Sequence, residues 1–280
     1  MIPGAPQFSR YESNVAATPS ATVGTTINHY VTTAHTKNPT FTQMIASTAF
    51  DATLVVLTIG VNNVSNGDSS SLLDIAIGAA SSETVIIPDL MAGFVGDVSV
   101  SAGSRHYIFP LYIPAGSRIS ARTQSVRTSG SMTVYVQLFG GPHNPDRWWY
   151  GQKVTAYGHN AANSAGTKFT PGDTGAEGTG VSLGTTTANH GCLVLGVQGH
   201  PDDVAWAGRT YHFDVGLDST ATQWLLADCW IAGSTSTELL GCDGLWLPLF
   251  WPVPSGTELM VRGECSGTAD ALSAAIYGVS

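Results

Sequence analysis

Residues 72–93 read LLDIAIGAASSETVIIPDLMAG, and residues 212–233, 140 positions further on, read HFDVGLDSTATQWLLADCWIAG. The two stretches align without a gap, with Asp74 opposite Asp214 and the same Ala-Gly pair at the end of both. Turn residues and apolar positions rarely agree together by chance over such a length. The alignment therefore indicates a repeated structural unit.

A second pair of stretches aligns under the same shift of 140 positions. IPAGSRISAR (residues 113–122) falls on VPSGTELMVR (residues 253–262). Pro114 fixes one backbone angle and Gly116 permits a positive one, so this motif predicts a tight turn between two strands. Since one offset serves both pairs of stretches, we expect an internal duplication with one topology in both copies.

The segments within each copy have the features of short β-strands. Residues 131–139 alternate apolar and polar side chains, as a strand with one buried face does. Each segment is bounded by Gly, Ser, Asn or Pro, which favour turns. In the first copy the predicted strands are residues 54–61, 73–77, 84–87, 107–113, 118–124 and 131–139. Strands of this number and length predict an all-β protein of two tandem jelly-roll-like antiparallel β-sandwich domains.

The repeat and the turn-forming residues define the expected domain boundaries. The connection GGPHNPDRWWYGQ combines a Gly-Gly-Pro break with Asn-Pro, which is typical of a linker. The N-terminal residues are rich in Pro, Ser, Thr and Ala without apolar periodicity, which predicts either an extended arm that lies across a neighbouring subunit or a frayed terminus. The predicted units are an arm (1–25), the first domain (26–141), the linker (142–152) and the second domain (153–280).

The composition limits the classes of partner. Charged residues make up 11% of the chain, against about 25% in a typical soluble domain. The net charge is −9, of which −8 falls on residues 142–280 and −1 on residues 1–141. An acidic chain lacks the basic surface that binds phosphate backbones, so we expect no direct nucleic-acid partner. The three lysines leave few flexible surface charges, which suits a surface that is covered in an assembly.

Targeting signals are not expected in this chain. MIPGAPQFSR has no basic stretch followed by an apolar core, so it is not predicted to be a signal peptide. No apolar run approaches about 20 residues, so no membrane span or membrane partner is predicted.

The cysteines do not show the spacing of a metal site. Cys192, Cys229, Cys242 and Cys265 form no CxxC pair. We interpret them as small buried apolar residues, and a disulfide between Cys229 and Cys242 remains an alternative. We expect no cofactor.

Catalytic and metal-binding motifs are weak. Ser182 lies in GVSLG, which has the spacing of a hydrolase nucleophile elbow, but the flanking sequences are not a strand and a helix. The histidines show no HExxH spacing. We interpret one group of acidic residues as a solvated loop followed by a strand edge rather than as an ion site. They are Asp202, Asp203, Asp214 and Asp218. The sequence therefore predicts a protein without catalytic residues or bound metal, and not an enzyme.

Aromatic residues are the strongest candidates for a binding surface. Tryptophans concentrate in the second copy, where they are expected either in the core, in a subunit contact or against a sugar ring. The residues predicted to form an interface are Trp148, Trp149, Tyr150, Trp206, Trp246 and Trp251.

Four motifs carry a resemblance to a known class of protein. They are ETVIIPDLMAG (83–93), FPLYIPAGSRISARTQS (109–125), VYVQLFGG (134–141) and WWYGQKVTAYG (148–158). Together they resemble structural proteins of tailed bacteriophages that carry tandem β-sandwich domains. The resemblance implies a virion component in many symmetric copies that is assembled in the host cytoplasm and contacts itself and major capsid or tail proteins. A head decoration or cement protein and a tail or baseplate subunit both fit it.

A binding module is the alternative function. A tail fibre or lectin-like domain would use the tryptophan-rich second copy to bind a host glycan.

Overall fold

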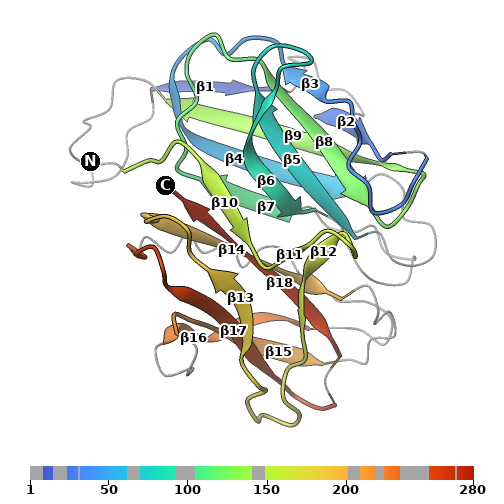
Figure 1. The fold of residues 1–280 in the computed structure, drawn as a ribbon, viewed down its shortest axis with the longest axis vertical. Coiled ribbons are helices and arrows are strands. Elements are labelled where there is room, and N and C mark those ends of the chain that lie inside the picture. Colours follow the sequence, from blue (N-terminus) through green and yellow to red (C-terminus); the bar gives the residue numbers. More distant parts are fainter. Residues whose placement is uncertain are drawn as a thin grey trace.

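The structure is a computed structural model that describes residues 9–14, 24–30, 32–61, 70–92, 105–140, 149–200, 209–218, 224–233, 252–268 and 270–280. Over these ranges the chain is all-β, and its strands form four antiparallel sheets (Figure 1). The prediction of an all-β protein built from antiparallel sheets is therefore confirmed. Among the described residues there is no helix of the length and apolarity that crossing a membrane requires.

The first half of the chain contains two sheets, which we call sheets A and B. Sheet A has the order β1-β9-β4-β7, with β2 also paired to β9, and sheet B has the order β3-β8-β5-β6. The strands of sheet A are β1 (Arg10–Ser13), β2 (Thr25–Asn28), β4 (Ala52–Val61), β7 (Arg105–Phe109) and β9 (Ser131–Gly140). Those of sheet B are β3 (Thr42–Ile45), β5 (Ser71–Ile77), β6 (Thr84–Met91) and β8 (Ile119–Ser125).

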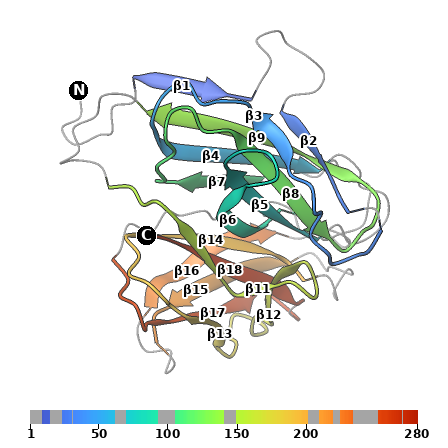
Figure 2. The ribbon, with the colours of Figure 1, turned by 45° about the horizontal axis from the view of Figure 1, so that its top comes forward.

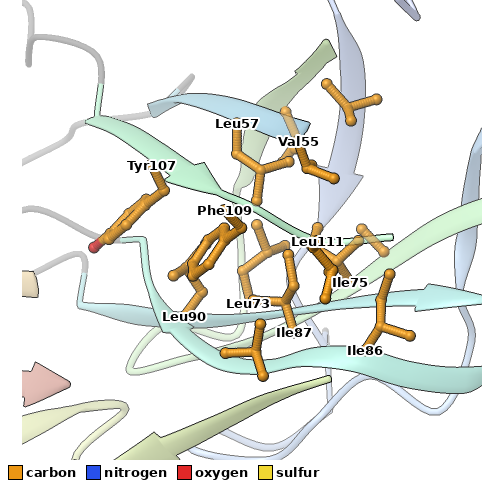
Figure 3. Packing of buried hydrophobic residues seen from close by; sticks show 14 of the residues in the cluster. Val55, Leu57, Leu73, Ile75, Ile86, Ile87, Leu90, Tyr107, Phe109 and Leu111 are labelled. Carbon is orange, nitrogen blue, oxygen red and sulfur yellow. The ribbon is translucent and has the colours of Figure 1, made fainter. Parts of the chain in front are cut away.

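Sheets A and B face each other across an apolar core. Figure 3 shows Val55 and Phe109 of sheet A pointing toward Leu73 and Ile87 of sheet B, and all four are fully buried. The predicted alternation in β9 is present, since every second residue of this strand is buried. The first half is therefore a β-sandwich.

The predicted strands of the first copy are all found, with shifted ends. The strand predicted at 84–87 runs on to Met91, and the one predicted at 107–113 ends at Phe109 because Pro110 cannot donate to the sheet. The prediction missed β1, β2 and β3, which have four residues each. Strands of this length are too short to show a period of two clearly.

The second half contains sheets C and D. Sheet C has the order β10-β18-β12-β11, with β14 also paired to β18, and sheet D has the order β13-β17-β15-β16. The strands of sheet C are β10 (Val154–Tyr157), β11 (His159–Asn160), β12 (Ala165–Phe169), β14 (Cys192–Gly199) and β18 (Leu272–Val279). Those of sheet D are β13 (Val181–Thr185), β15 (Thr210–Gly216), β16 (Trp224–Gly233) and β17 (Glu258–Cys265).

Two strands of sheet C, β14 and β18, are buried on both faces. Every residue of β14 and β18 is buried, so neither strand alternates. Leu195 and Ile276 pack into the core between sheets C and D. On the opposite face Val194 and Tyr277 belong to the core of the first half. Figures 1 and 2 show β10, β14 and β18 at the boundary beside β6, and these contacts close the open side of the first sandwich.

Part of the predicted N-terminal arm belongs to the protein's own sheet. β1 pairs with β9, and the Tyr11 ring lies 5.3 Å from that of Phe139. β2 begins at Thr25, inside the segment predicted as the arm. Residues 10–13 are therefore attached to the first half, while residues 1–8 and 15–23 lie outside the described part of the chain.

Candidate functional site

The predicted interface aromatics are described only in part. Trp149 is 43% exposed, and its indole lies directly over Gly191, at a place that a Cβ would fill. Tyr150 stacks on Tyr112 with ring centroids 5.8 Å apart. The other predicted interface residues, which fall outside the described ranges, are Trp148, Trp206, Trp246 and Trp251.

The junction between the two halves is centred on Tyr277 of β18. Its hydroxyl accepts the Met91 N–H at 2.7 Å and donates to the Asp89 carbonyl at 3.2 Å. The Tyr277 ring meets the rings of Tyr107 and Phe109 edge-on, with centroids 5.9 and 6.2 Å away. Burial raises the pKa of this phenol well above its usual value. Tyr277 thus joins the core of the first half to sheet C through both polar and apolar contacts.

Buried polar side chains also cross the junction. Arg105 Nη1 donates to the Val197 carbonyl at 3.2 Å, and Gln198 Nε2 donates to Ser70 Oγ at 3.2 Å. All four residues are in the interior. Buried donors without partners would be costly, so these bonds favour one relative position of the halves.

An ion-pair cluster in the first half surrounds Asp74. The Asp74 side chain is 2% exposed, and its Oδ1 lies 2.9 Å from Lys37 Nζ. Asp74 Oδ1 also accepts the Asp89 N–H at 3.0 Å, and Asp74 Oδ2 accepts Arg122 Nε–H at 2.8 Å. Lys37 Nζ lies 2.7 Å from Asp89 Oδ1, and His159 of the second half lies 3.7 Å from Asp89 Oδ2. Two basic side chains therefore balance two carboxylates.

A corresponding cluster in the second half surrounds Asp214. Asp214 Oδ2 lies 2.8 Å from Arg262 Nε and 2.7 Å from Arg262 Nη2. Asp214 Oδ1 accepts the Asp228 N–H at 2.7 Å. Glu177 Oε2 lies 3.3 Å from Arg262 Nε, and the Trp224 ring covers the guanidinium at 3.9 Å. Glu177, Asp214 and Asp228 each place one oxygen within 4.8 Å of the others.

These contacts correct the interpretation of Asp214 as part of a solvated loop followed by a strand edge, because β15 is paired on both sides, with β16 and β17. Asp214 is 1% exposed and is held by ion pairs. Asp218 lies just after β15, and Asp202 and Asp203 lie outside the described residues. Burial and the nearby Asp214 carboxylate raise the pKa of Glu177, because negative charges are crowded here.

A threonine anchors the Pro-Gly turn in each half. Thr48 Oγ1 donates to the Pro114 carbonyl at 2.8 Å, and Thr186 Oγ1 donates to the Pro254 carbonyl at 2.7 Å. The two turns are the ones predicted from the repeated motif. Their hydrogen bonds hold the entry of β8 and of β17, which is a structural role.

The residues weighed for catalysis do not converge in the described part of the chain. Ser182 lies within the strand β13, so the strand-turn-helix context of a nucleophile elbow is not formed there. Its Oγ accepts the Gly184 N–H at 3.3 Å. His190 contacts the Tyr157 hydroxyl at 2.7 Å, while His212 is paired with a glutamate on the neighbouring strand.

Two of the cysteines are buried free thiols. Cys192 is fully buried and Cys265 is 1% exposed. Burial raises the pKa of Cys192 to about 12. The interpretation as small buried apolar residues is confirmed for these two, while the side chains of Cys229 and Cys242 lie outside the described residues, so the disulfide alternative stays a prediction.

No protein-family model and no curated protein sequence matches this chain. Among solved structures it is similar to a chain of Sulfolobus Turreted Icosahedral Virus, with 9% identity and a TM-score of 0.33 over 96% of this chain and 90% of that one. A chain of infectious bursal disease virus Gt strain gives 11% identity and a TM-score of 0.25 over 98% and 73%. The PBSX exported protein XepA gives 11% and 0.23 over 97% and 87%. At these TM-scores the function has to be argued from the residues of this chain.

Proposed function

We propose that this chain is a non-enzymatic structural protein that works by packing against other protein subunits, as a component of a virion. The observation that carries the proposal is the burial of β14 and β18 of sheet C on both faces, which joins the two sandwiches into one body. The described polar clusters hold sheets and turns in place. A rigid protein whose polar groups stabilise its own fold is suited to be a structural subunit.

The surface composition supports the same role. The chain has three lysines and 11% charged residues, so little side-chain entropy is lost when a neighbour covers its surface. Tyr11 of β1 is 52% exposed and Trp149 is 43% exposed, which offers aromatic anchors at separate places. We propose contacts with copies of itself and with other virion proteins there.

The two halves share more than a fold class, which supports an origin by duplication. Asp74 pairs with Arg122 in the β5–β8 register, and Asp214 pairs with Arg262 in the β15–β17 register. Each arginine lies 48 residues after its aspartate. A doubled subunit presents similar surfaces twice, which suits a symmetric shell or tube. The finer assignment that we propose is a phage head decoration or cement protein, or a tail or baseplate subunit.

Whole particles provide the direct test. Antibodies against the purified chain should label intact virions in a regular array, and reconstruction of the particle should contain density of this two-sandwich shape. Labelling confined to the host cytoplasm in cells that contain finished particles would refute the proposal.

The purified chain tests the alternative of a glycan-binding module. On a glycan array the chain should give no saturable signal if contacts with protein subunits are its function. Saturable sugar binding that is lost in Trp149→Ala would favour the lectin-like alternative and would count against a purely structural role.

A further inference from the structure

The two ion-pair clusters occupy corresponding places but differ in charge. In the second half Glu177 stands 140 positions after Lys37, so a carboxylate replaces an ammonium group. One guanidinium, that of Arg262, then faces three carboxylates. The net charge of the second cluster is therefore lower by two units, one for the absent lysine and one for the glutamate in its place.

The first half shows which carboxylate oxygens a cation contacts at this place. Lys37 Nζ lies between Asp74 Oδ1 and Asp89 Oδ1, at 2.9 and 2.7 Å. A cation is therefore held by the two aspartates of the first cluster, in addition to the arginine on Asp74 Oδ2. The Lys37 contacts are observed independently of the acidic residues of the second half, and they show that this arrangement of carboxylates binds a cation.

The atoms that would receive a cation are present in the second half. Asp214 Oδ1 accepts the Asp228 N–H, as Asp74 Oδ1 accepts the Asp89 N–H. Asp228 has the same left-handed backbone as Asp89, with φ of 54° and 51°. The side chains of Asp89 and Asp228 therefore leave their strands in a similar way. Glu177 adds a third carboxylate where the first half has its lysine.

We propose that Glu177, Asp214 and Asp228 bind a divalent cation, with calcium the best fit, at the place that the Lys37 ammonium occupies in the first half. This inference does not depend on the proposed virion role. A divalent ion offsets this difference of two charge units. Carboxylate oxygens are hard ligands of the type that Ca²⁺ prefers.

The geometry suits calcium. Ligand oxygens lie about 2.3–2.6 Å from Ca²⁺, so two of them are at most about 5 Å apart across the ion. One oxygen from each carboxylate already lies within 4.8 Å of the others. Glu177 and Asp228 are exposed, so water can complete the coordination shell. With three protein carboxylates, we expect a Kd of about 0.1–1 mM, as in weak extracellular calcium modules.

Arg262 does not block this place. It contacts Asp214 through Oδ2 and Glu177 through Oε2, at 3.3 Å in the second case, and the Trp224 ring lies 3.9 Å from its guanidinium. Asp214 Oδ1 is therefore left for the cation. The first half shows that the two oxygens of one buried aspartate can serve an arginine and a second cation together.

Terbium luminescence tests the site on the full chain. Tb³⁺ replaces Ca²⁺ at oxygen sites, and Trp224 is placed to sensitise it. We expect saturable emission that excess CaCl₂ suppresses, and a rise in Tm of about 2–4 °C in 10 mM CaCl₂ relative to EDTA. Wild-type protein with neither response would overturn the proposal.

Three variants make the test specific. Glu177→Lys rebuilds the charge arrangement of the first half, so it should lose the Tb³⁺ signal and have a Tm in EDTA at least equal to that of the wild type. Asp228→Asn should weaken Tb³⁺ binding at least tenfold. Glu258→Gln is the matched control, since Glu258 begins the strand that carries Arg262 and is not among the charges that act on Glu177, and it should bind as the wild type does. A Tb³⁺ signal that survives in Glu177→Lys would refute this site.

Discussion

Replacing Tyr277 by phenylalanine measures how strongly the two halves are joined. The substitution keeps the ring, which is fully buried against the first half, and removes only the hydroxyl. The Met91 N–H, now 2.7 Å from that hydroxyl, would then be left without its acceptor in the interior. A buried donor without a partner costs about 1–3 kcal/mol, so we expect the free energy of unfolding to fall by that amount.

Urea denaturation followed by tryptophan fluorescence is the assay. Tyr11→Phe is the matched control, because the Tyr11 ring is exposed and water can replace the bonds of its hydroxyl with Gln137, Ser13 and Tyr135. This control should change the stability by less than about 0.5 kcal/mol. Tyr277→Ala removes the ring as well and should cost about 3–5 kcal/mol.

The shape of the unfolding curve is a second readout. Since the core of the first half continues into sheet C, the wild-type protein should unfold in one transition. If Tyr277→Phe were as stable as Tyr11→Phe, or if wild-type halves unfolded in two separate transitions, the role assigned to the junction would be wrong.

Three further predictions concern single side chains. Gly166→Ala should lower the free energy of unfolding by about 1–3 kcal/mol, and with it the urea midpoint. The added Cβ would lie 2.7 Å from Met91 Sδ and would clash with the Ala274 carbonyl. An unchanged midpoint would contradict the close packing of β12. Burial lowers the pKa of His190, so its neutral form is favoured in the folded state and stability should fall as the pH drops below about 6.5. In urea titrations, His190→Asn should lose less stability than the wild type between pH 7.5 and pH 5.5. Identical pH profiles of the two proteins would contradict the assigned role of His190. The Cys192 thiol, with its pKa raised to about 12, should resist alkylation at pH 8 until urea unfolds the chain, as measured by mass spectrometry of its peptide.

The strands of the first half were predictable where one face is buried and the other is not. β9 shows the alternation because sheet A has a core side and an outer side. In contrast, β14 and β18 are buried on both faces, and no pattern within them reveals that the second face belongs to the other half. The shared core was therefore not predicted.

The ion-pair clusters were predictable in part. The shift of 140 positions pairs Asp74 with Asp214 and Arg122 with Arg262, and these residues form the centres of the two clusters. The same shift pairs Asp89 with a cysteine. The residue equivalent to Asp89 in space is Asp228, one position earlier.

The reason for this displacement is a difference in the β-bulges. The pairing of β5 with β6 changes register at two places, and that of β15 with β16 at three. The additional bulge lies between Trp230 and Ala232, so the residues of β16 before it, Asp228 included, pair one position earlier than the shift of 140 predicts. An alignment without gaps cannot detect such a change.

Sheet C gives the molecule a mechanical property. Because this sheet is a wall of both sandwiches, neither one can tilt without breaking the packing of the other. The distance between the outer strand β1 and the far sheet D is therefore constant, as in a spacer of set length. A lattice built from such spacers would take its repeat distance from the folded chain itself.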